Sequence, residues 1–445
     1  MNKSDELPVL PIELLSDWVI RIPPGDWQVG RRAVHLSQGT SLQVPPPSVY
    51  TAVLEAYETL PVFEPEAAGW LKGAHLRGVS TQETTARFSL DPKSVAVFAD
   101  PSGYNRLQAG VDYAFDPEWG TIGRLESGCL RADQPVYACY RCGLGRLDGI
   151  FLRADDRMIY RQGQPHIAAP QIPSPQGGEI LLASVWLSPR LERLTLANLL
   201  PILEENYPHE QPYTAEEIRR LLPKTIDHLV NGGDLRILAW GDSVTDGSYL
   251  PDPSTQRWQE QFVHRLRQSF PTAYIELKTL GWGGRNTQNF LDEPPGSPYN
   301  YREQVLGSGA DLVISEFVND AGLSPAGVEQ QYGAFLDDFR QAGMEWIILT
   351  PHYVRPDWMD LDREKEIDDD PRPYVAGLRA FAARHGVALA DASKRWGRLW
   401  RQGIPYTTLL SNAINHPDPR GMKLFADALM ALFEGLSSDA QRDAG

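Results

Sequence analysis

The second half of the chain alternates between short apolar runs and longer helical patterns, and this alternation limits the fold more than any other feature. Five apolar runs of strand length occur after residue 230, at 235–240, 273–277, 311–317, 346–350 and 386–390. Helical spacing occurs between or after them, at 256–269, 301–306, 325–342, 372–385 and 419–434. Strands of this kind, separated by helices, form a parallel sheet covered on both faces. We therefore predict an α/β fold for residues 231–445.

The first 190 residues have a different pattern. Apolar or alternating runs recur between turns that contain Pro, Gly and Asp, at 18–22, 94–98, 135–140, 149–153 and 180–187. Short strands at this spacing are typical of a sandwich or a small barrel. Pro45-Pro-Pro-Ser48 predicts a loop or a boundary between two submodules. We expect a β-rich accessory domain over residues 1–190.

Residues 191–230 change character again. Both 191–200 and 214–222 have helical spacing, and Thr214 with Glu217 has the form of a capping box. We predict a helical connector over 191–230, leading into the α/β domain.

Composition narrows the classes of function. The net charge of −16 argues against a protein that binds a nucleic-acid backbone. No apolar stretch approaches the roughly 20 residues that cross a bilayer, and the N-terminus lacks the apolar core of a signal peptide. We expect a cytoplasmic protein with no membrane partner.

The three cysteines, Cys129, Cys139 and Cys142, lack the second ligand pair of a zinc site and are expected to be structural thiols.

Polar residues follow several of the predicted strands. Gly241-Asp-Ser243 follows the first, Gly284-Arg-Asn-Thr follows the second, and Asn319-Asp320 follows the third; Asn412 and His416 precede the last helix. Open α/β sheets bind their ligands outside the carboxyl ends of the strands. A serine hydroxyl is a weak nucleophile that needs a neighbouring base, and His416 is the candidate because it lies in a polar loop.

The order Ser, Gly, Asn, His resembles the SGNH, or GDSL-type, hydrolases. Gly284-Arg-Asn-Thr is similar to the second block of the carbohydrate acetylesterases in that family. The resemblance implies a three-layer, flavodoxin-like fold with a five-stranded parallel sheet. It further implies that Ser243 is the nucleophile and His416 the base, and that Gly284 and Asn319 bind the oxyanion. Further candidates for the pocket lining follow the second and fourth strands: Arg285, Asn286, His352 and Arg355. For His352, a loop position that faces solvent is an alternative.

The chain departs from the family pattern in two places. Position 317 is Phe where the third block commonly has Gly, and this change could alter the lining of the pocket. The family commonly carries Asp three residues before the histidine, but that position is Ala413. The group that orients His416 is therefore open. The candidates are Asn412, Asp391, Asp418 and a backbone carbonyl that would leave a Ser–His dyad.

These residues favour a serine esterase that works through an acyl-enzyme, without a metal or organic cofactor. The expected substrate is a small-molecule or carbohydrate ester with a short acyl group, such as an O-acetyl sugar. A lipid or a thioester is an alternative substrate. The rival reading is a catalytically impaired hydrolase domain in a glycan-binding or assembly protein, motivated by Ala413 and the large β-rich half. The β-rich half could mediate oligomerisation in either case, and the sequence leaves the oligomeric state open.

Overall fold

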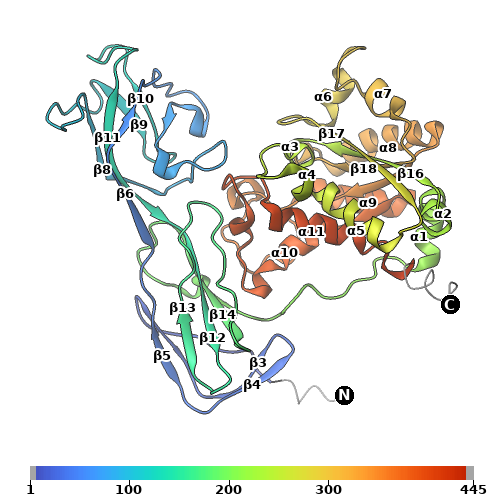
Figure 1. Ribbon diagram of the computed structural model, residues 1–445, viewed down its shortest axis with the longest axis horizontal. Coiled ribbons are helices and arrows are strands. Elements are labelled where there is room, and N and C mark those ends of the chain that lie inside the picture. The colour runs from blue at the N-terminus through green and yellow to red at the C-terminus, as the bar shows by residue number, and fades with distance from the viewer. Residues whose placement is uncertain (1–6, 437–445) are drawn as a thin grey trace. The chain divides into compact units, whose positions relative to one another are not determined.

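The computed structural model describes residues 7–436, which form two compact units (Figure 1). The β-rich unit contains the chain up to Asn206 together with Arg363–Lys365 and Leu399–Asn415. The α/β unit contains Tyr207–Asp362, Glu366–Arg398 and the chain from His416 onward. The division falls after Asn206, and two segments from the second half of the chain belong to the β-rich unit. The predicted boundaries lay at 190 and 230, and the return of the two later segments to the β-rich unit was not predicted.

The α/β unit is built on a five-stranded parallel sheet with the order β17-β16-β18-β19-β20. Its strands are β16 (Asp234–Gly241), β17 (Tyr274–Gly281), β18 (Leu312–Glu316), β19 (Glu345–Leu349) and β20 (Ala388–Ala390). The predicted flavodoxin-like sheet is confirmed. The order of strands reverses between β16 and β18, and this reversal is where such sheets open a crevice for ligands.

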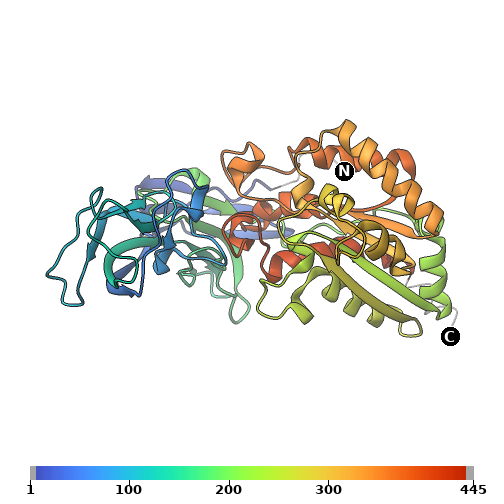
Figure 2. The same cartoon turned by 90° about the horizontal axis from the view of Figure 1, so that it is seen from above.

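Helices cover both faces of this sheet (Figure 2). They are α1 (Ala215–Leu221), α2 (Pro223–Asn231), α3 (Ser243–Asp246), α4 (Pro253–Gln256), α5 (Trp258–Ser269), α6 (Thr287–Asp292), α7 (Tyr301–Gln304), α8 (Pro325–Ala342), α9 (Pro373–His385), α10 (Ala392–Gly397) and α11 (Pro419–Met430). Leu238, Trp240 and Val313 point to the core beneath α8 and α9. The alternate residues Ile237 and Ile314 are buried on the opposite face, where α5 and α11 pack together.

The β-rich unit consists of several short antiparallel sheets, and the predicted β-rich character is confirmed. Its strands are β1 (Glu13–Ser16), β2 (Val19–Ile22), β3 (Gly25–Val29), β4 (Arg32–Leu36), β5 (Thr40–Gln43), β6 (Ser48–Tyr57), β7 (Ala74–His75), β8 (Leu90–Phe98), β9 (Tyr113–Asp116), β10 (Thr121–Arg124), β11 (Val136–Leu144), β12 (Arg146–Leu152), β13 (Met158–Arg161), β14 (Ile180–Leu187) and β15 (Leu199–Pro201). One hydrophobic core lies between β2, β4, β12 and β14. A second, separate core lies between β6, β8, β10 and β11.

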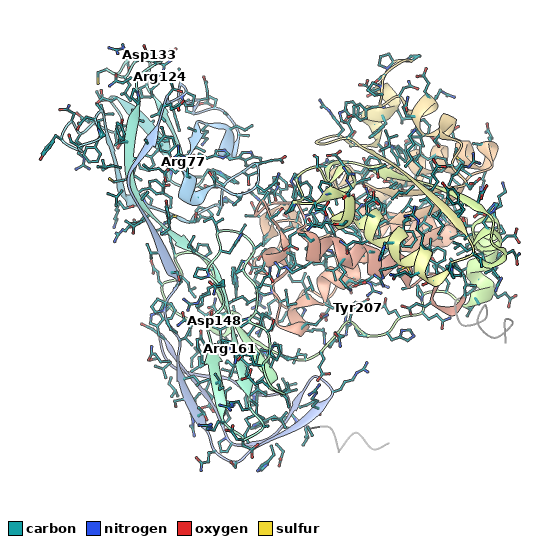
Figure 3. The ribbon with its side chains drawn as sticks, in the orientation of Figure 1. Arg77, Arg124, Asp133, Asp148, Arg161 and Tyr207 are labelled. Carbon is teal, nitrogen blue, oxygen red and sulfur yellow. The ribbon has the colours of Figure 1, made fainter. Side chains whose placement is uncertain are left out.

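Asp148, which is labelled in Figure 3, forms a buried ion pair with Arg146 where the chain passes from one of these cores to the other. Arg146 is 2% exposed and Asp148 is fully buried, and Arg146 Nε lies 2.8 Å from Asp148 Oδ1. Arg146 Nη2 also donates to the carbonyl of Pro45 at 2.7 Å. Gly163 N and the Tyr160 hydroxyl donate to the Asp148 carboxylate. Because a buried charge needs full hydrogen bonding, this network fixes the loop that starts at Pro45.

The helix predicted at 191–200 is wrong. The structure has a short 3-10 turn at Leu196–Asn198, followed by β15, which pairs with β14. Leu194, Leu199 and Ile202 bury their side chains in the first core. Pairing with a neighbouring strand overrides local helical spacing here. The second predicted helix is present, and Thr214 and Glu217 form the expected capping box at α1.

The cysteines are unpaired: Cys129 is exposed, whereas Cys139 and Cys142 lie on β11. Within residues 7–436, no three His, Cys, Asp or Glu side chains are grouped so that they could hold a metal ion. Over the same residues, no helix has both the length and the apolar character needed to cross a membrane.

Candidate active site

The turn after β16 presents Ser243 at the carboxyl edge of the sheet. Gly241 ends the strand, and a methyl group there would lie 2.3 Å from the carbonyl oxygen of Glu316 and 2.1 Å from Thr245 Oγ1. Only glycine therefore fits at this position. Asp242 accepts a hydrogen bond from Val244 N at 3.0 Å and caps α3, in which Ser243 is the first residue. The serine is half-buried.

His416 lies beside this serine. Its Nε2 is 3.2 Å from Ser243 Oγ, which is hydrogen-bond distance. The imidazole is 7% exposed and stacks on the ring of Tyr249, with centroids 4.1 Å apart and planes 8° apart. The Tyr249 hydroxyl donates to the carbonyl of Pro417 at 3.1 Å. Tyr249 thus contacts the histidine through its ring and the next residue through its hydroxyl.

The turn after β17 lies next to the serine. A methyl group on Gly283 would lie 3.9 Å from Ser243 Cβ. Gly284 has φ +71°, a left-handed conformation that favours glycine. In the described part of the chain, nothing lies within 4 Å of the position that its Cβ would occupy. An N–H in such a turn can approach a ligand closely.

Asn319 is connected to both of these turns. Its backbone N–H donates to Asp242 Oδ2 at 2.9 Å, and its side-chain Nδ2 donates to the carbonyl of Arg285 at 3.2 Å. An amide nitrogen carries two hydrogens, so one remains for a ligand among the contacts within residues 7–436. These bonds hold the Asn319 amide in a fixed position between the serine turn and the glycine turn.

Three buried carboxyl groups lie next to the turns of the site: Asp242, Glu316 and Asp320. Asp242 joins the serine turn to Asn319, and Asp320 accepts from Thr287 N, Thr287 Oγ1 and the Tyr332 hydroxyl. Burial raises the pKa of Asp242 to about 7, against the backbone N–H bonds that lower it. Burial also raises the pKa of Asp320. Glu316, fully buried at the end of β18, has its pKa raised well above the ordinary value by burial and then by the charge of Asp242.

The candidates for orienting His416 have other hydrogen bonds. Both Asp418 oxygens accept bonds from its own helix: Oδ1 from the N–H groups of Arg420 and Gly421, and Oδ2 from the Arg420 guanidinium. Asn412 belongs to the β-rich unit, and its Oδ1 accepts from Ile414 N at 2.9 Å and Asn415 N at 2.8 Å. The direct role of Asn412 at the imidazole stays a prediction.

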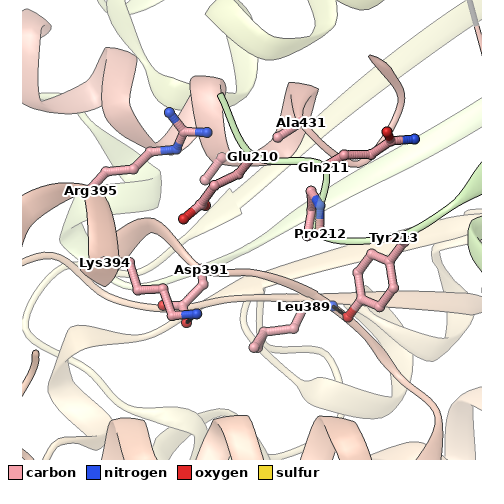
Figure 4. A pocket seen from close by; sticks show the side chains of 10 residues that line it. Glu210, Gln211, Pro212, Tyr213, Leu389, Asp391, Lys394, Arg395 and Ala431 are labelled. Carbon is pink, nitrogen blue, oxygen red and sulfur yellow. Dashed lines mark hydrogen bonds and ion pairs between the residues drawn. The ribbon is translucent and has the colours of Figure 1, made fainter. Parts of the chain in front are cut away.

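Asp391 is bound to a different set of groups. Its carboxylate accepts from Arg379 Nε at 2.8 Å and from Thr350 Oγ1 at 3.1 Å. It also lines a cavity of about 390 Å³ with Tyr213 and Arg395 (Figure 4). Asp391 therefore forms a half-buried ion pair with Arg379 at the end of β20.

Two expectations about the pocket lining were wrong. Phe317 is 1% exposed, and its ring lies 4.9 Å from that of Trp240 in the core, so it does not line a pocket. His352 is fully buried and packs against Trp396 and Phe425, whereas we expected a pocket or solvent position. Arg285 is exposed, with its guanidinium 5.2 Å from the ring centroid of Trp282.

Tyr249 was missed by the sequence analysis. It lies six residues after Ser243, outside the motif, and no periodicity or spacing marks it. Its stacking on His416 is a consequence of how the turn after α3 and the loop before α11 come together. An aromatic residue just beyond a nucleophile motif is the only signal the sequence offers.

Part of the chain matches a family of known proteins. Residues 239–424 match the model of the GDSL-like Lipase/Acylhydrolase family. Among curated protein sequences, none matches this chain.

Several solved structures resemble the chain in part. A two-domain esterase active on acetylated mannans is 16% identical, with a TM-score of 0.40, over 49% of this chain and 53% of that chain. An acetyl xylan esterase variant from Geobacillus stearothermophilus is 16% identical, with a TM-score of 0.35, over 44% of this chain and 93% of that chain. A member of the lipolytic G-D-S-L family from Veillonella parvula DSM 2008 is 20% identical, with a TM-score of 0.33, over 45% of this chain and 100% of that chain. The match to the two-domain esterase spans about half of its length.

Proposed function

We propose, from the membership of residues 239–424 in the GDSL-like lipase/acylhydrolase family, that the protein is a serine esterase that hydrolyses short-chain acyl esters. The observation that carries the proposal is the 3.2 Å approach of His416 Nε2 to Ser243 Oγ, beside the turn that holds Gly284. A nucleophile and a base at hydrogen-bond distance are the minimum set for acyl transfer.

The acylation step uses these two side chains. Ser243 Oγ attacks the ester carbonyl while His416 Nε2 accepts its proton, and the carbonyl oxygen becomes negatively charged. The N–H groups of Gly284 and Ser243 and the Asn319 amide stabilise that charge because they are oriented before the reaction. His416 then gives the proton to the leaving alcohol, and an acyl-enzyme on Ser243 remains.

Deacylation repeats the sequence with water. His416 Nε2 accepts a proton from water, which attacks the acyl carbon, and the same donors stabilise the second oxyanion. Collapse of this intermediate returns the proton to Ser243 and releases the carboxylic acid. Neither step requires a metal or an organic cofactor.

An O-acetyl group on a carbohydrate is the substrate that the residues around Gly284 favour. Gly284-Arg-Asn-Thr has the form found in the carbohydrate acetylesterases of the family. The exposed Arg285 can donate hydrogen bonds to sugar hydroxyls, and its guanidinium lies over the ring of Trp282. Trp282 in turn stacks on Tyr299, with centroids 4.3 Å apart. These groups form a firm polar and aromatic surface next to the glycine turn.

The test compares wild type and Ser243→Ala on p-nitrophenyl esters of two, four and eight carbons and on acetylated xylooligosaccharides. We expect the fastest hydrolysis with acetyl, release of acetate from the oligosaccharide, and background rates for Ser243→Ala. A fluorophosphonate probe should label wild type at Ser243 and leave Ser243→Ala unlabelled. Equal rates for the two proteins on every ester, together with an unlabelled serine, would contradict the proposal and favour a catalytically impaired scaffold.

A further inference from the structure

Two sets of hydrogen bonds fix the turn after β18 to the turn after β17, and all of their residues belong to the α/β unit. Asn319 Nδ2 donates to the carbonyl of Arg285 at 3.2 Å. Asp320, the next residue, is 3% exposed, and its Oδ1 accepts from Thr287 N at 3.1 Å and from Thr287 Oγ1 at 2.9 Å. Arg285 directly follows Gly284. The two turns that carry the proposed oxyanion donors are therefore joined through Asp320 as well as through Asn319.

A tyrosine of α8 holds the other oxygen of this carboxylate. The Tyr332 hydroxyl donates to Asp320 Oδ2 at 2.9 Å. Tyr332 is 2% exposed, and its ring centroid lies 5.7 Å from that of Trp346 and 5.9 Å from that of Phe335. Because these rings confine the Tyr332 side chain in the core, its hydroxyl holds the carboxylate in one position.

The direction of these hydrogen bonds follows from the hydrogens available. An ionised carboxylate only accepts, so the single hydrogen of the Tyr332 hydroxyl goes to Asp320. The Tyr374 hydroxyl, whose oxygen is 2.6 Å from that of Tyr332, then donates to the Tyr332 oxygen. On the opposite side, Gln331 Nε2 donates to Thr287 Oγ1, and the Thr287 hydroxyl hydrogen goes to Asp320. Asp320 therefore receives oriented hydrogen bonds from both sides.

We infer that Tyr332 is a positioning residue for the oxyanion donors: its hydroxyl, oriented by that of Tyr374, holds Asp320 against Thr287 and thereby fixes the neighbouring Asn319 amide. This inference rests on the proposed function. Tyr332 is buried in the core, so it acts on the reaction through Asp320 and not by contact with the substrate. Because the oxyanion forms only in the transition state, a change at Tyr332 should alter the chemical step more than substrate binding.

The chain offers a matched control in the same core. Tyr301 is 3% exposed, and within residues 7–436 its hydroxyl forms no hydrogen bond with the groups around Asp320. Tyr332→Phe and Tyr301→Phe each remove one buried oxygen from this core, but only the first takes a hydrogen bond from Asp320. Tyr374→Phe keeps that bond and removes only the hydroxyl that orients it.

The experiment measures kcat and KM for p-nitrophenyl acetate in the full chain, normalised to the folded fraction from circular dichroism. We expect Tyr332→Phe to lower kcat by about 10-fold, which is less than the 10²–10³ typical of losing a donor, because the donor is displaced and not removed. KM should stay within about twofold of wild type, since uniform binding is unchanged. Tyr374→Phe should lower kcat by about threefold, the effect of one neutral hydrogen bond, and Tyr301→Phe should match wild type.

A double-mutant cycle with Asn319→Ala separates positioning from a general structural effect. Without the Asn319 amide, the Tyr332 hydroxyl has no such donor to position, so Tyr332→Phe should then lower kcat by less than about threefold. A purely structural effect would be equal in the two backgrounds. If Tyr332→Phe fails to fold, Tyr374→Phe takes its place in the cycle and should likewise lose most of its effect in the Asn319→Ala background.

Two kinds of result would overturn the inference, and they differ. The first requires an active wild type and an inactive Ser243→Ala. Equal kcat for Tyr332→Phe and Tyr301→Phe, or an equal effect of the tyrosine variant with and without Asn319, would then show that Tyr332 does not position the amide and would leave the esterase intact. A wild type that neither hydrolyses esters nor is labelled at Ser243 by a fluorophosphonate would remove the proposed function and the inference with it.

Discussion

The α/β unit and the β-rich unit place their functional groups in opposite ways. All strands of the parallel sheet point in one direction, so the residues after β16, β17 and β18 meet at one edge and bring Ser243, Gly284 and Asn319 together. Antiparallel strands end alternately at both edges and cannot gather successive strand ends in this way. The strands of the β-rich unit instead enclose two separate hydrophobic cores. Parallel strands therefore bring short motifs at successive strand ends together in one site, and antiparallel strands do not.

The buried charged residues also have different surroundings in the two units. In the α/β unit, the buried acids Asp242, Glu316 and Asp320 lie directly behind the candidate site. In the β-rich unit, the buried pair of Arg146 and Asp148 joins two cores and is fully hydrogen-bonded. The buried acids of the α/β unit hold the turns of the candidate site in place. The Arg146–Asp148 pair instead stabilises the fold of the β-rich unit. The following variants test this division, from the largest expected effect to the smallest.

Asp148→Ala should destabilise the β-rich unit strongly. It leaves the Arg146 guanidinium buried without its partner, and breaking such a pair costs about 3–5 kcal/mol. The midpoint of urea unfolding should fall accordingly. The double variant Arg146→Met with Asp148→Leu removes both charges and should recover part of the loss. A double variant as unstable as Asp148→Ala would contradict the assignment of the cost to the unpaired charge.

Asn319→Ala should lower kcat/KM by about 10²–10³, because it removes one preorganised donor for the oxyanion. Its backbone bond to Asp242 remains, so the fold of the turn should persist. Asn300→Ala is the matched control: Asn300 caps α7 through its side chain and has no assigned role in chemistry. Steady-state kinetics on p-nitrophenyl acetate decide the matter, and equal losses in the two variants would argue against an oxyanion role.

Tyr249→Leu should lower kcat by about 10-fold. The flat ring stacked at 4.1 Å orients the imidazole and favours the imidazolium that forms during proton transfer, a contact of about 0.5–2 kcal/mol. Tyr249→Phe keeps the ring and loses only the bond to Pro417, so its kcat should stay within about threefold of wild type. Similar kcat values for Leu and Phe at this position would show that stacking contributes nothing to the rate.

Glu316→Gln should change the pH dependence of stability with little effect at low pH. The pKa of Glu316 is raised in the folded state, so between its unfolded value of about 4.3 and its folded value the native state binds more protons than the unfolded state. Stability contributed by this group is therefore greatest at low pH and is lost as the pH rises through that window. Thermal unfolding from pH 4 to pH 9 should show a melting temperature that falls less for Glu316→Gln than for wild type, by a few degrees. A parallel pair of curves would show that Glu316 titrates normally.

The sequence was sufficient for the parallel sheet and for the residues at its edge. β16, β18, β19 and β20 fall on apolar runs, because a strand buried on both faces has a nearly continuous apolar sequence. β17, at the edge of the sheet, alternates between exposed and buried residues. Ser243 and His416 were both chosen from their place after a strand or before a helix, and the structure puts them at hydrogen-bond distance.

What the sequence could not show depends on contacts between distant segments. The bond from Thr84 to Asn412 spans 328 positions, and no local pattern records it. β15 was read as helix because the spacing of its leucines fits a helix, whereas pairing with β14 decides its conformation. His352 was read as a loop residue, but Trp396 and Phe425, brought in by later helices, enclose its ring.

The return of Leu399–Asn415 to the β-rich unit has a consequence for biosynthesis. A chain that leaves the ribosome at ~5–20 residues per second needs about 10–40 s to add the roughly 200 residues between Asn206 and Asn415. During that interval the strand pairs of the β-rich unit can form, but the acceptors for Ser184 and Thr84, Gly403 and Asn412, have not yet been made. The carbonyls that these hydroxyls bind arrive immediately before His416. Nascent chains therefore complete these contacts of the β-rich unit late in synthesis, and a product truncated before residue 416 lacks the candidate base.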